Sequence, residues 1–323
     1  MSRLATTELP ALALGDDAET GPVGAYIVTY RRPRLLVESL RAVVAQSHRL
    51  HQIVVVNNDP DTDIPSLLGG DFPGVGVANV HRNVGSSGGF AAALRLAYDA
   101  GVTWAWLFDD DVLPYPDALA ELLAGYEEVH TAGVPVGILA PLQESPRAVF
   151  GVSLWRHRLV PPPRLQAGDR PYPVDMTYWA GMLVHRRVIE RVGFPRSDFF
   201  RCFGDYEYCL RARTAGLRVV AVPRSRVRHD PGHPTAVVRW GRRSVRFNWS
   251  PSRNYYHVRN AAYTMRFVIH DPLAAVLHTL RQVRLAGGDL LYEDAKLTRV
   301  RLRFRGLVDG FGGRLGRRED LER

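Results

Sequence analysis

The segment TWAWLFDDDVLP, residues 103–114, places an apolar run directly before three aspartates, Asp109, Asp110 and Asp111. The run has the length and composition of a buried β-strand. In an extended chain alternate side chains share a face, so Asp109 and Asp111 point one way and Asp110 the other. Because neighbouring carboxylates repel each other, the triplet predicts a site for a divalent cation, Mg²⁺ or Mn²⁺, which prefers oxygen ligands. An acidic turn or a helix N-cap is the alternative.

The same arrangement of apolar strand and polar loop occurs earlier in the chain. Strand-like runs at 24–30, 52–57 and 75–83 alternate with helical patterns at 33–47, 88–101 and 116–133. Uniformly apolar strands that alternate with helices indicate an α/β fold with a mostly parallel central sheet, covered on both faces. Ligands bind at the carboxyl ends of such strands. The polar segments TYRR, NNDPD, HRNVGSSGG and DDD all fall at these ends.

The second half of the chain is less regular. After an irregular stretch at 141–178, the pattern predicts a strand and short helix at 178–193, a helix at 204–216 and a strand at 217–222. A basic segment and an amphipathic helical tail follow. We therefore expect three parts: a poorly ordered N-terminus (1–22), a catalytic domain (23–235) and a basic, mainly helical C-terminal region (236–323).

The net charge of +9 is concentrated in the tail, where residues 281–318 hold ten basic and four acidic side chains. Such a bias suits a polyanion, either an anionic membrane surface or a nucleic acid, and a solvated helical surface is the alternative. The chain has two cysteines, no apolar run of membrane-spanning length and no signal-peptide pattern. These features predict a cytoplasmic protein.

Other residues suited to chemistry are scattered along the sequence. Asp205 lies near a helix start and is a candidate general base, whereas Glu207 pairs by spacing with Arg211, as a surface ion pair would. His229 follows a strand and could complete a metal shell or simply be solvated. Trp179 offers an aromatic face for a sugar, although a core tryptophan is the commoner explanation.

The order of these motifs carries a resemblance. VTYRRP, VVVNNDPD, RNVGSSGGF, FDDDVLP, YWAGMLVHRRV, GDYEYCLRARTAG and VRH follow one another between about residues 24 and 229. This string resembles the inverting nucleotide-sugar glycosyltransferases of family 2, which have the GT-A fold. The combination of RNVGSSGGF with the DDD triplet is similar to actinobacterial galactofuranosyltransferases. RNYYHVRN (253–260) is similar to the related rhamnosyltransferases.

The resemblance implies a metal-dependent reaction. Asp205 matches the catalytic base, and Asp109, Asp111 and His229 match the residues around Mn²⁺ or Mg²⁺. The nucleotide-sugar donor, with UDP-galactofuranose favoured, is expected to lie on the strand-end residues Thr29, Tyr30, Arg31, Asn57, Asn58, Asp59, Arg82, Asn83, Gly88 and Asp110. The acceptor, a hydroxyl of a glycan or lipid-linked sugar in cell-envelope polysaccharide synthesis, is expected near Trp179, Gly181 and Glu207.

Two departures from the family pattern affect these expectations. Many relatives have Asp at the position of Asn57, so the base, uracil or thymine, stays open. Many also have Glu in place of Gly204, directly before the catalytic base Asp205. The alternatives are a dTDP-rhamnose-dependent enzyme and a non-catalytic relative that binds a nucleotide sugar. A nucleic-acid binder would leave the aspartates unexplained, so we expect no nucleic acid and place the basic tail on the inner face of the plasma membrane.

Overall fold

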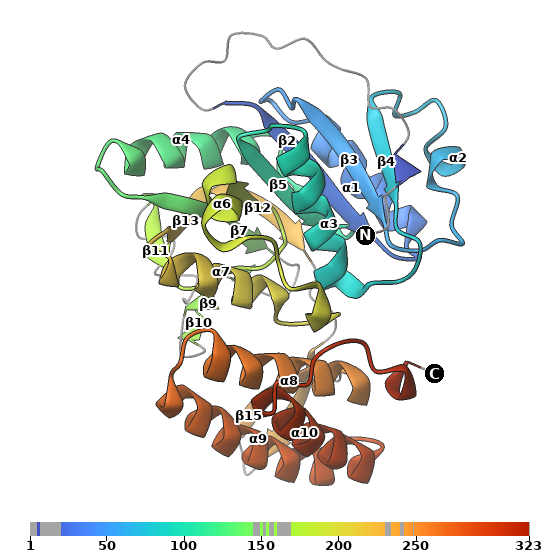
Figure 1. Cartoon of the computed structure of the whole chain (residues 1–323), viewed down its shortest axis with the longest axis vertical. Helices are drawn as coiled ribbons and strands as arrows, with labels where there is room; N and C mark the ends of the chain where they lie inside the picture. Colours follow the sequence, from blue (N-terminus) through green and yellow to red (C-terminus); the bar gives the residue numbers. More distant parts are fainter. Residues whose placement is uncertain are drawn as a thin grey trace.

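The computed structural model describes residues 5–6, 21–144, 149–150, 153–154, 158–159, 169–229, 234–239, 242–247 and 249–322. The expected poorly ordered N-terminus (1–22) lies almost entirely outside the described residues. Figure 1 shows a mixed sheet with helices on both of its faces and, below it, a unit of three further helices. The α/β expectation is therefore confirmed.

The first half of the sheet is parallel. Strands β2 (Val23–Thr29), β3 (Gln52–Asn57), β4 (Val75–Asn79) and β5 (Trp104–Asp109) lie in the order β4-β3-β2-β5 with parallel registers. All seven residues of β2 are buried. This burial explains why the strands are apolar throughout instead of alternating.

The second half of the sheet departs from a parallel arrangement. Strand β12 (Met182–His185) is antiparallel to β5 and to β7 (Val136–Glu144), and β7 is parallel to β13 (Arg218–His229). Shorter strands complete the described sheet structure: β1 (Ala5–Thr6), β6 (Val112–Pro114), β8 (Val149–Phe150), β9 (Ser153–Leu154), β10 (Arg158–Leu159) and β11 (Tyr172–Val174). Strand β6 pairs with the end of β13, which brings the aspartate triplet to His229.

Each face of the sheet has its own core. Helices α1 (Pro33–Val44), α2 (Ile64–Leu68) and α4 (Ala118–His130) pack on one face, as the apolar spacing of Leu36, Leu40 and Val43 requires. The opposite face is covered by a second set of helices, α3 (Gly85–Asp99), α6 (Arg186–Val192) and α7 (Gly204–Thr214). The sheet is thus buried on both sides, as expected.

The C-terminal region contains α8 (Pro251–Phe267), α9 (Pro272–Tyr292) and α10 (Lys296–Phe311). It also contains an antiparallel hairpin, β14 (Pro234–Arg239) and β15 (Arg242–Phe247), where only a basic segment was expected, and a short 3₁₀ turn at Glu319–Leu321. Another 3₁₀ turn, Ser197–Phe199, precedes α7. Helix α8 lies between α7 and the other two helices (Figure 1). No helix in the described part of the chain is long and apolar enough to cross a membrane.

Candidate active site

Most of the residues expected to bind the metal and the nucleotide sugar lie where β2, β3, β4, β5 and β13 end. Thr29, Asn57 and Asp109 are the last residues of β2, β3 and β5. Because β2, β3 and β5 are parallel neighbours, their carboxyl ends form one edge of the sheet. The structure therefore brings the aspartate triplet next to the loop at the end of β2.

Asp110 is fully buried and connects the loop after β2 to the sheet. Its carboxylate accepts a hydrogen bond from the Thr29 hydroxyl at 2.7 Å and from the Tyr30 backbone N–H at 3.3 Å. Arg32 lies 2.6 Å from the other carboxylate oxygen. Burial raises the pKa of Asp110 to about 6, and the guanidinium and the hydroxyl oppose that rise. Asp110 thus positions the loop that follows β2.

Asp111 and His229 face each other across the junction of β6 and β13. Their Oδ1 and Nε2 atoms are 3.6 Å apart, because β6 pairs Val112 with His229. The second oxygen of Asp111 lies 2.6 Å from Arg32, whereas buried Oδ1 receives no hydrogen bond from the described residues. A buried carboxylate oxygen that accepts no hydrogen bond is a candidate cation ligand.

Asp109 completes the acidic group. Burial raises its pKa well above the ordinary range, and the negative charges of Asp111 and Asp110 raise it further. Arg32 supplies one positive charge against these carboxylates. The described residues contain no ready-made group of three metal-ligating side chains. The excess of carboxylates, the unbonded Asp111 oxygen and the neighbouring imidazole still fit a hard divalent cation.

Asp205 lies in the first turn of α7, close enough to Asp109 for the two charges to interact. Burial raises its pKa to about 7, although the N–H groups of the helix start and the charge of Arg253 act in the opposite direction. The Tyr206 N–H donates to its Oδ1 at 2.9 Å. A partly exposed carboxylate with a pKa near neutrality is suited to accept a proton.

The loop before Asp205 has an unusual backbone. Phe200, Cys202 and Phe203 have φ values of 63°, 64° and 66°, in the left-handed region that side chains disfavour. The side chain of Asn260 on α8 donates to carbonyls of this loop, and so does that of Arg259. Helix α8 of the C-terminal region therefore stabilises the loop at residues 199–203, which positions Asp205 at the start of α7.

The residues at the end of β3 that were expected to bind the nucleotide sugar already bond to other parts of the protein. Asn57 donates to the Thr62 carbonyl and to Asn79 Oδ1, both at 2.9 Å, and accepts from the Asp59 N–H. Asn58 bonds the start of α3 through its Oδ1 and Nδ2. Their contact with a base stays a prediction, and the structure shows that they shape the loop.

The remaining donor residues surround this loop. Arg31 is exposed, has a φ of 55° and lies 3.4 Å from Asp59. Arg82 is exposed. The carboxamide oxygen of Asn83 accepts the Gly85 N–H at 2.8 Å. A side chain at Gly88 would collide with Val84, so this glycine serves the packing of α3. The two arginines, together with the exposed Tyr30, are therefore the solvent-facing residues among those expected to bind the nucleotide sugar.

The three expected acceptor residues lie inside the protein. Trp179 is 4% exposed and stacks on Phe90, with ring centroids 4.6 Å apart. Gly181 is buried against Pro141 and Val227. This burial agrees with the alternative that Trp179 is a core residue.

Glu207 is also inside the protein. Its side chain is fully buried and pairs with Arg211 at 2.8 Å. The i,i+4 pair exists, but it is not the surface pair that the spacing suggested, because α7 turns Glu207 toward the 192–194 segment, whose carbonyls Arg211 also bonds. Contact of these three residues with an acceptor stays a prediction.

Several residues of the site were not predicted individually. Arg32 stands in the TYRR segment but was not singled out. Arg253, Arg259 and Asn260 lie within RNYYHVRN, whose role the sequence does not reveal. Tyr206, the residue after Asp205, packs against half-buried Tyr178, and the two ring centroids are 5.3 Å apart. This pair offers the aromatic surface that was expected from Trp179.

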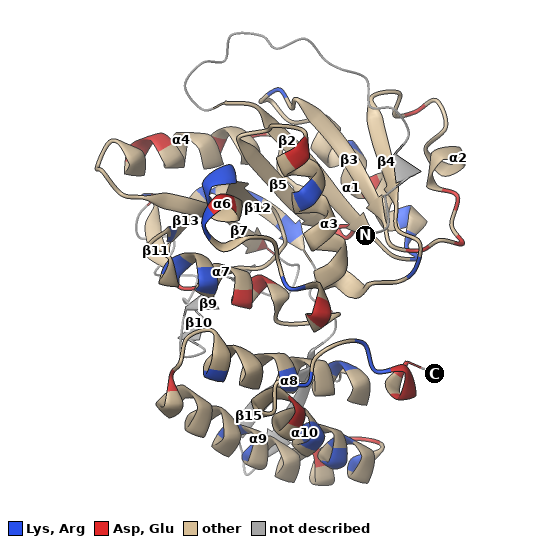
Figure 2. Ribbon diagram, in the orientation of Figure 1, with Lys and Arg blue, Asp and Glu red and all other residues tan. Residues whose placement is uncertain are grey.

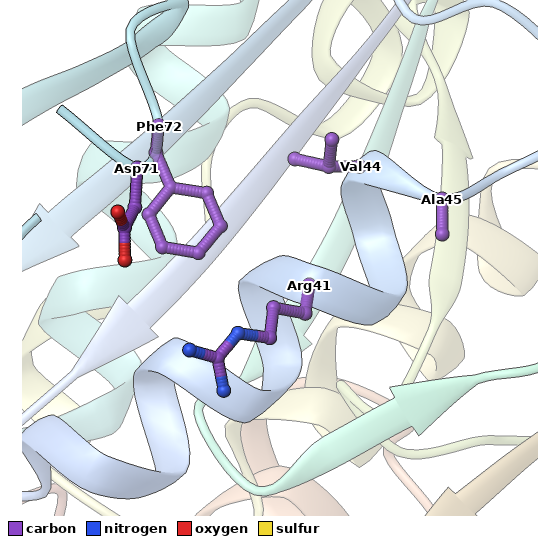
Figure 3. A pocket seen from close by; sticks show the side chains of 5 residues that line it. All are labelled: Arg41, Val44, Ala45, Asp71 and Phe72. Atoms are coloured by element: carbon purple, nitrogen blue, oxygen red, sulfur yellow. The ribbon is translucent and has the colours of Figure 1, made fainter.

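One surface hollow lies at the opposite edge of the sheet. Figure 3 shows Arg41, Val44 and Ala45 from the end of α1 facing Asp71 and Phe72 from the segment before β4. The ends of helices and the starts of strands meet there, so the hollow is distant from Asp205 along the strand direction. None of the residues expected to form the site lines it.

Similar proteins are known over most of the length of the chain. The family model described as glycosyltransferase-like family 2 matches residues 21–250. The galactofuranosyltransferase GlfT1 of Mycolicibacterium smegmatis is 26% identical over 253 residues, which cover 76% of this chain and 83% of the relative. The dTDP-rhamnosyl transferase RfbF of Shigella flexneri is 25% identical over 260 residues, covering 80% and 83% respectively.

A solved structure extends the comparison to the fold. GalNAc-T7, crystallised with UDP, GalNAc and Mn²⁺, superimposes with a TM-score of 0.58 at 15% sequence identity, and the match covers 92% of this chain and 57% of that one. At this identity the likeness concerns the fold, which is that of the GT-A glycosyltransferases.

Proposed function

The chain belongs to glycosyltransferase-like family 2, and we propose that this glycosyltransferase moves galactofuranose from its uridine diphosphate donor to a hydroxyl of a glycan or lipid-linked acceptor. The acceptor would belong to cell-envelope polysaccharide synthesis. The observation that carries the proposal is the proximity of Asp205, with a pKa of about 7, to the acidic cluster around Asp109. A base and a site for the charged part of the donor are thereby adjacent.

Asp205 acts as the base in the proposed reaction. It takes the proton from the acceptor hydroxyl while that oxygen forms a bond to the anomeric carbon and the bond from this carbon to the diphosphate breaks. One displacement inverts the anomeric configuration. The half-buried ring of Tyr206, the residue after Asp205, packs against that of Tyr178, and the two rings can orient the acceptor sugar.

A divalent cation, Mn²⁺ or Mg²⁺, would be held by Asp111, Asp109 and His229. When bound, it would neutralise the charge that develops on the leaving diphosphate. Asp110 and Thr29 would hold the β2 loop against the nucleotide, and Arg31 and Arg82 would meet its phosphates from the solvent side. In support, Asp111 Oδ1 accepts no hydrogen bond from the described residues and faces His229.

Thermal unfolding against a panel of nucleotides tests the proposal, because a ligand of the folded state raises the melting temperature. We expect UDP and UDP-galactofuranose to stabilise the protein when Mn²⁺ is present, and expect Asp111→Asn to remove that metal dependence. Incubation with UDP-galactofuranose and a glycan acceptor should then release UDP. Stabilisation without metal, or by no nucleotide, would contradict the proposal.

A second candidate is transfer of rhamnose from a thymidine diphosphate donor. It is favoured by the likeness to RfbF and by the RNYYHVRN segment, which α8 contains. Preferential stabilisation by dTDP and dTDP-rhamnose would select it. A non-catalytic role is disfavoured, because Asp109, Asp111, Asp205 and His229 are all retained.

A further inference from the structure

Helix α9 buries three of its polar residues and exposes most of its large apolar ones. His278, Gln282 and Asp289 are buried on the face toward α10. Arg303 of α10 donates to Gln282 Oε1 at 2.6 Å and to Asp289 Oδ2 at 2.6 Å. A helix that faces water normally has the reverse arrangement. The polar contacts between the two helices therefore leave the apolar residues of α9 uncovered by the described part of the chain.

The outer face of α9 carries an apolar stripe that is interrupted by the exposed Arg284. The first five members lie three or four residues from one another, and the last lies two further turns along the helix, so they share one side. Each is at least half exposed: Leu273, Val276, Leu277, Leu280, Val283 and Leu291. With 21 residues at about 1.5 Å per residue, the stripe runs along roughly 30 Å of helix.

Helix α10 extends this surface. Leu297 is 80% exposed and Val308 is 62% exposed, and Phe304 lies between them on the same side of the helix. Figure 1 shows α9 and α10 together at the end of the molecule farthest from the sheet. An exposed apolar surface of this length, carried by two adjacent helices, marks an interaction site.

The charges around the apolar stripe are almost all positive. In residues 272–311 the exposed basic side chains are Arg281, Arg284, Lys296 and Arg301, whereas the exposed acidic one is Asp294, which pairs with Arg299. Figure 2 shows the basic positions distributed along α9 and α10. Arginines beside leucines and valines complement a partner surface that has negative charges on its outside and an apolar layer beneath them.

We propose that the outer face of α9 and α10 docks on the surface of an anionic lipid bilayer. Leucine and valine side chains would enter the boundary between headgroups and acyl chains, and the arginines would meet lipid phosphates. A second copy of the chain is the less suitable occupant, because a symmetric contact would bring the same arginines together.

Cosedimentation with vesicles tests the docking surface. We expect the full chain to bind vesicles of phosphatidylcholine mixed with phosphatidylglycerol, and to bind phosphatidylcholine alone at least about tenfold more weakly. The double variant Leu277→Glu/Leu280→Glu should lose at least about tenfold in binding to the anionic vesicles, because charges replace the inserted apolar groups. Val44→Glu/Leu67→Glu, at exposed apolar positions of α1 and α2, is the matched control and should bind normally.

A second pair of variants tests the charge. Arg281→Gln/Arg284→Gln should weaken binding to anionic vesicles by about fivefold for each charge removed and leave binding to phosphatidylcholine unchanged. All variants should keep wild-type thermal stability and nucleotide binding, so a failure of docking is distinguishable from a failure of the donor site. Absence of vesicle binding by the wild type would overturn the proposal. So would a dimer in sedimentation velocity that Leu277→Glu/Leu280→Glu dissociates.

Discussion

The side-chain amide of Asn260 donates to the carbonyl oxygen of Cys202 at 2.8 Å, across a sequence separation of 58 residues. The same amide lies 2.9 Å from the Arg201 carbonyl and 3.1 Å from that of Phe199. Positive φ values in this loop cost on the order of 1 kcal/mol each and persist only where surrounding contacts enforce them. One buried asparagine on α8 thus fixes the backbone that leads into Asp205.

Replacing this amide should therefore affect both folding and catalysis. We expect Asn260→Leu to lower the free energy of unfolding by about 2–4 kcal/mol, because the loop carbonyls lose their donors inside the protein. In the folded fraction kcat should fall at least about tenfold while the KM for the donor changes little. Urea unfolding and steady-state kinetics measure these effects. Asn254→Leu, on the same helix, is the control, and equal effects of the two variants would refute the specific role of Asn260.

The pKa of Asp205 sets the pH dependence of the proposed reaction. A general base acts in its deprotonated form, so kcat/KM should rise with pH and level off above about 7. Asp205→Asn should lower kcat by at least about a thousandfold and leave UDP binding in place, since the amide has a similar shape but accepts no proton. Near-normal turnover of Asp205→Asn would show that another group is the base.

The same carboxylate should destabilise the folded protein at neutral and higher pH. Its folded pKa of about 7 exceeds the unfolded value, so stability is lost as pH rises from about 4 to 7. Without metal, we expect Asp205→Asn to raise the free energy of unfolding at pH 8 by about 1–2 kcal/mol, after allowance for its partial exposure. At pH 5 the gain should be smaller. An equal gain at both pH values would exclude titration of Asp205 as its source.

Arg32 bridges Asp110 and Asp111 at 2.6 Å from each. Removing it with Arg32→Met should destabilise the metal-free protein by about 1–3 kcal/mol, because a buried carboxylate loses its positive neighbour. Mn²⁺ should then raise the melting temperature of Arg32→Met more than that of the wild type, since the ion compensates a larger excess of negative charge. Arg34→Met, 92% exposed on the side chain, is the control. Equal Mn²⁺ effects in all three proteins would argue against a metal at the triplet.

The sequence predicts the residues at the strand ends better than it predicts the contacts that hold the loop before Asp205. The strand ends could be predicted, because an apolar run followed by Asp109 or Asn57 signals its own position at the sheet edge. The hydrogen bonds from Asn260 to the loop before Asp205 could not be predicted. They join segments 58 residues apart, and no local sequence pattern indicates the contact. Similarly, the Glu207–Arg211 spacing predicts a pair on any helix, and only the packing of α7 decides that the carboxylate is buried.

Asn57 shows how the folded structure alters the interpretation of a sequence departure. Its Nδ2 donates to the Thr62 carbonyl and to Asn79 Oδ1, both at 2.9 Å, at a position that is 1% exposed. Asn57→Asp, the residue of many relatives, would face both acceptors with a carboxylate oxygen. We therefore expect the variant to lose about 2–4 kcal/mol of stability in urea unfolding.

The control for this prediction is Asn79→Ala in the Asn57→Asp background, which removes one of the two opposed acceptors. It should restore part of the lost stability, because the repulsion between the introduced carboxylate and the side-chain oxygen of Asn79 disappears. If the amide of Asn57 stabilises the loop and does not contact the nucleobase, the preference for UDP over dTDP should change little in Asn57→Asp. A reversed nucleotide preference with unchanged stability would instead assign Asn57 to base recognition.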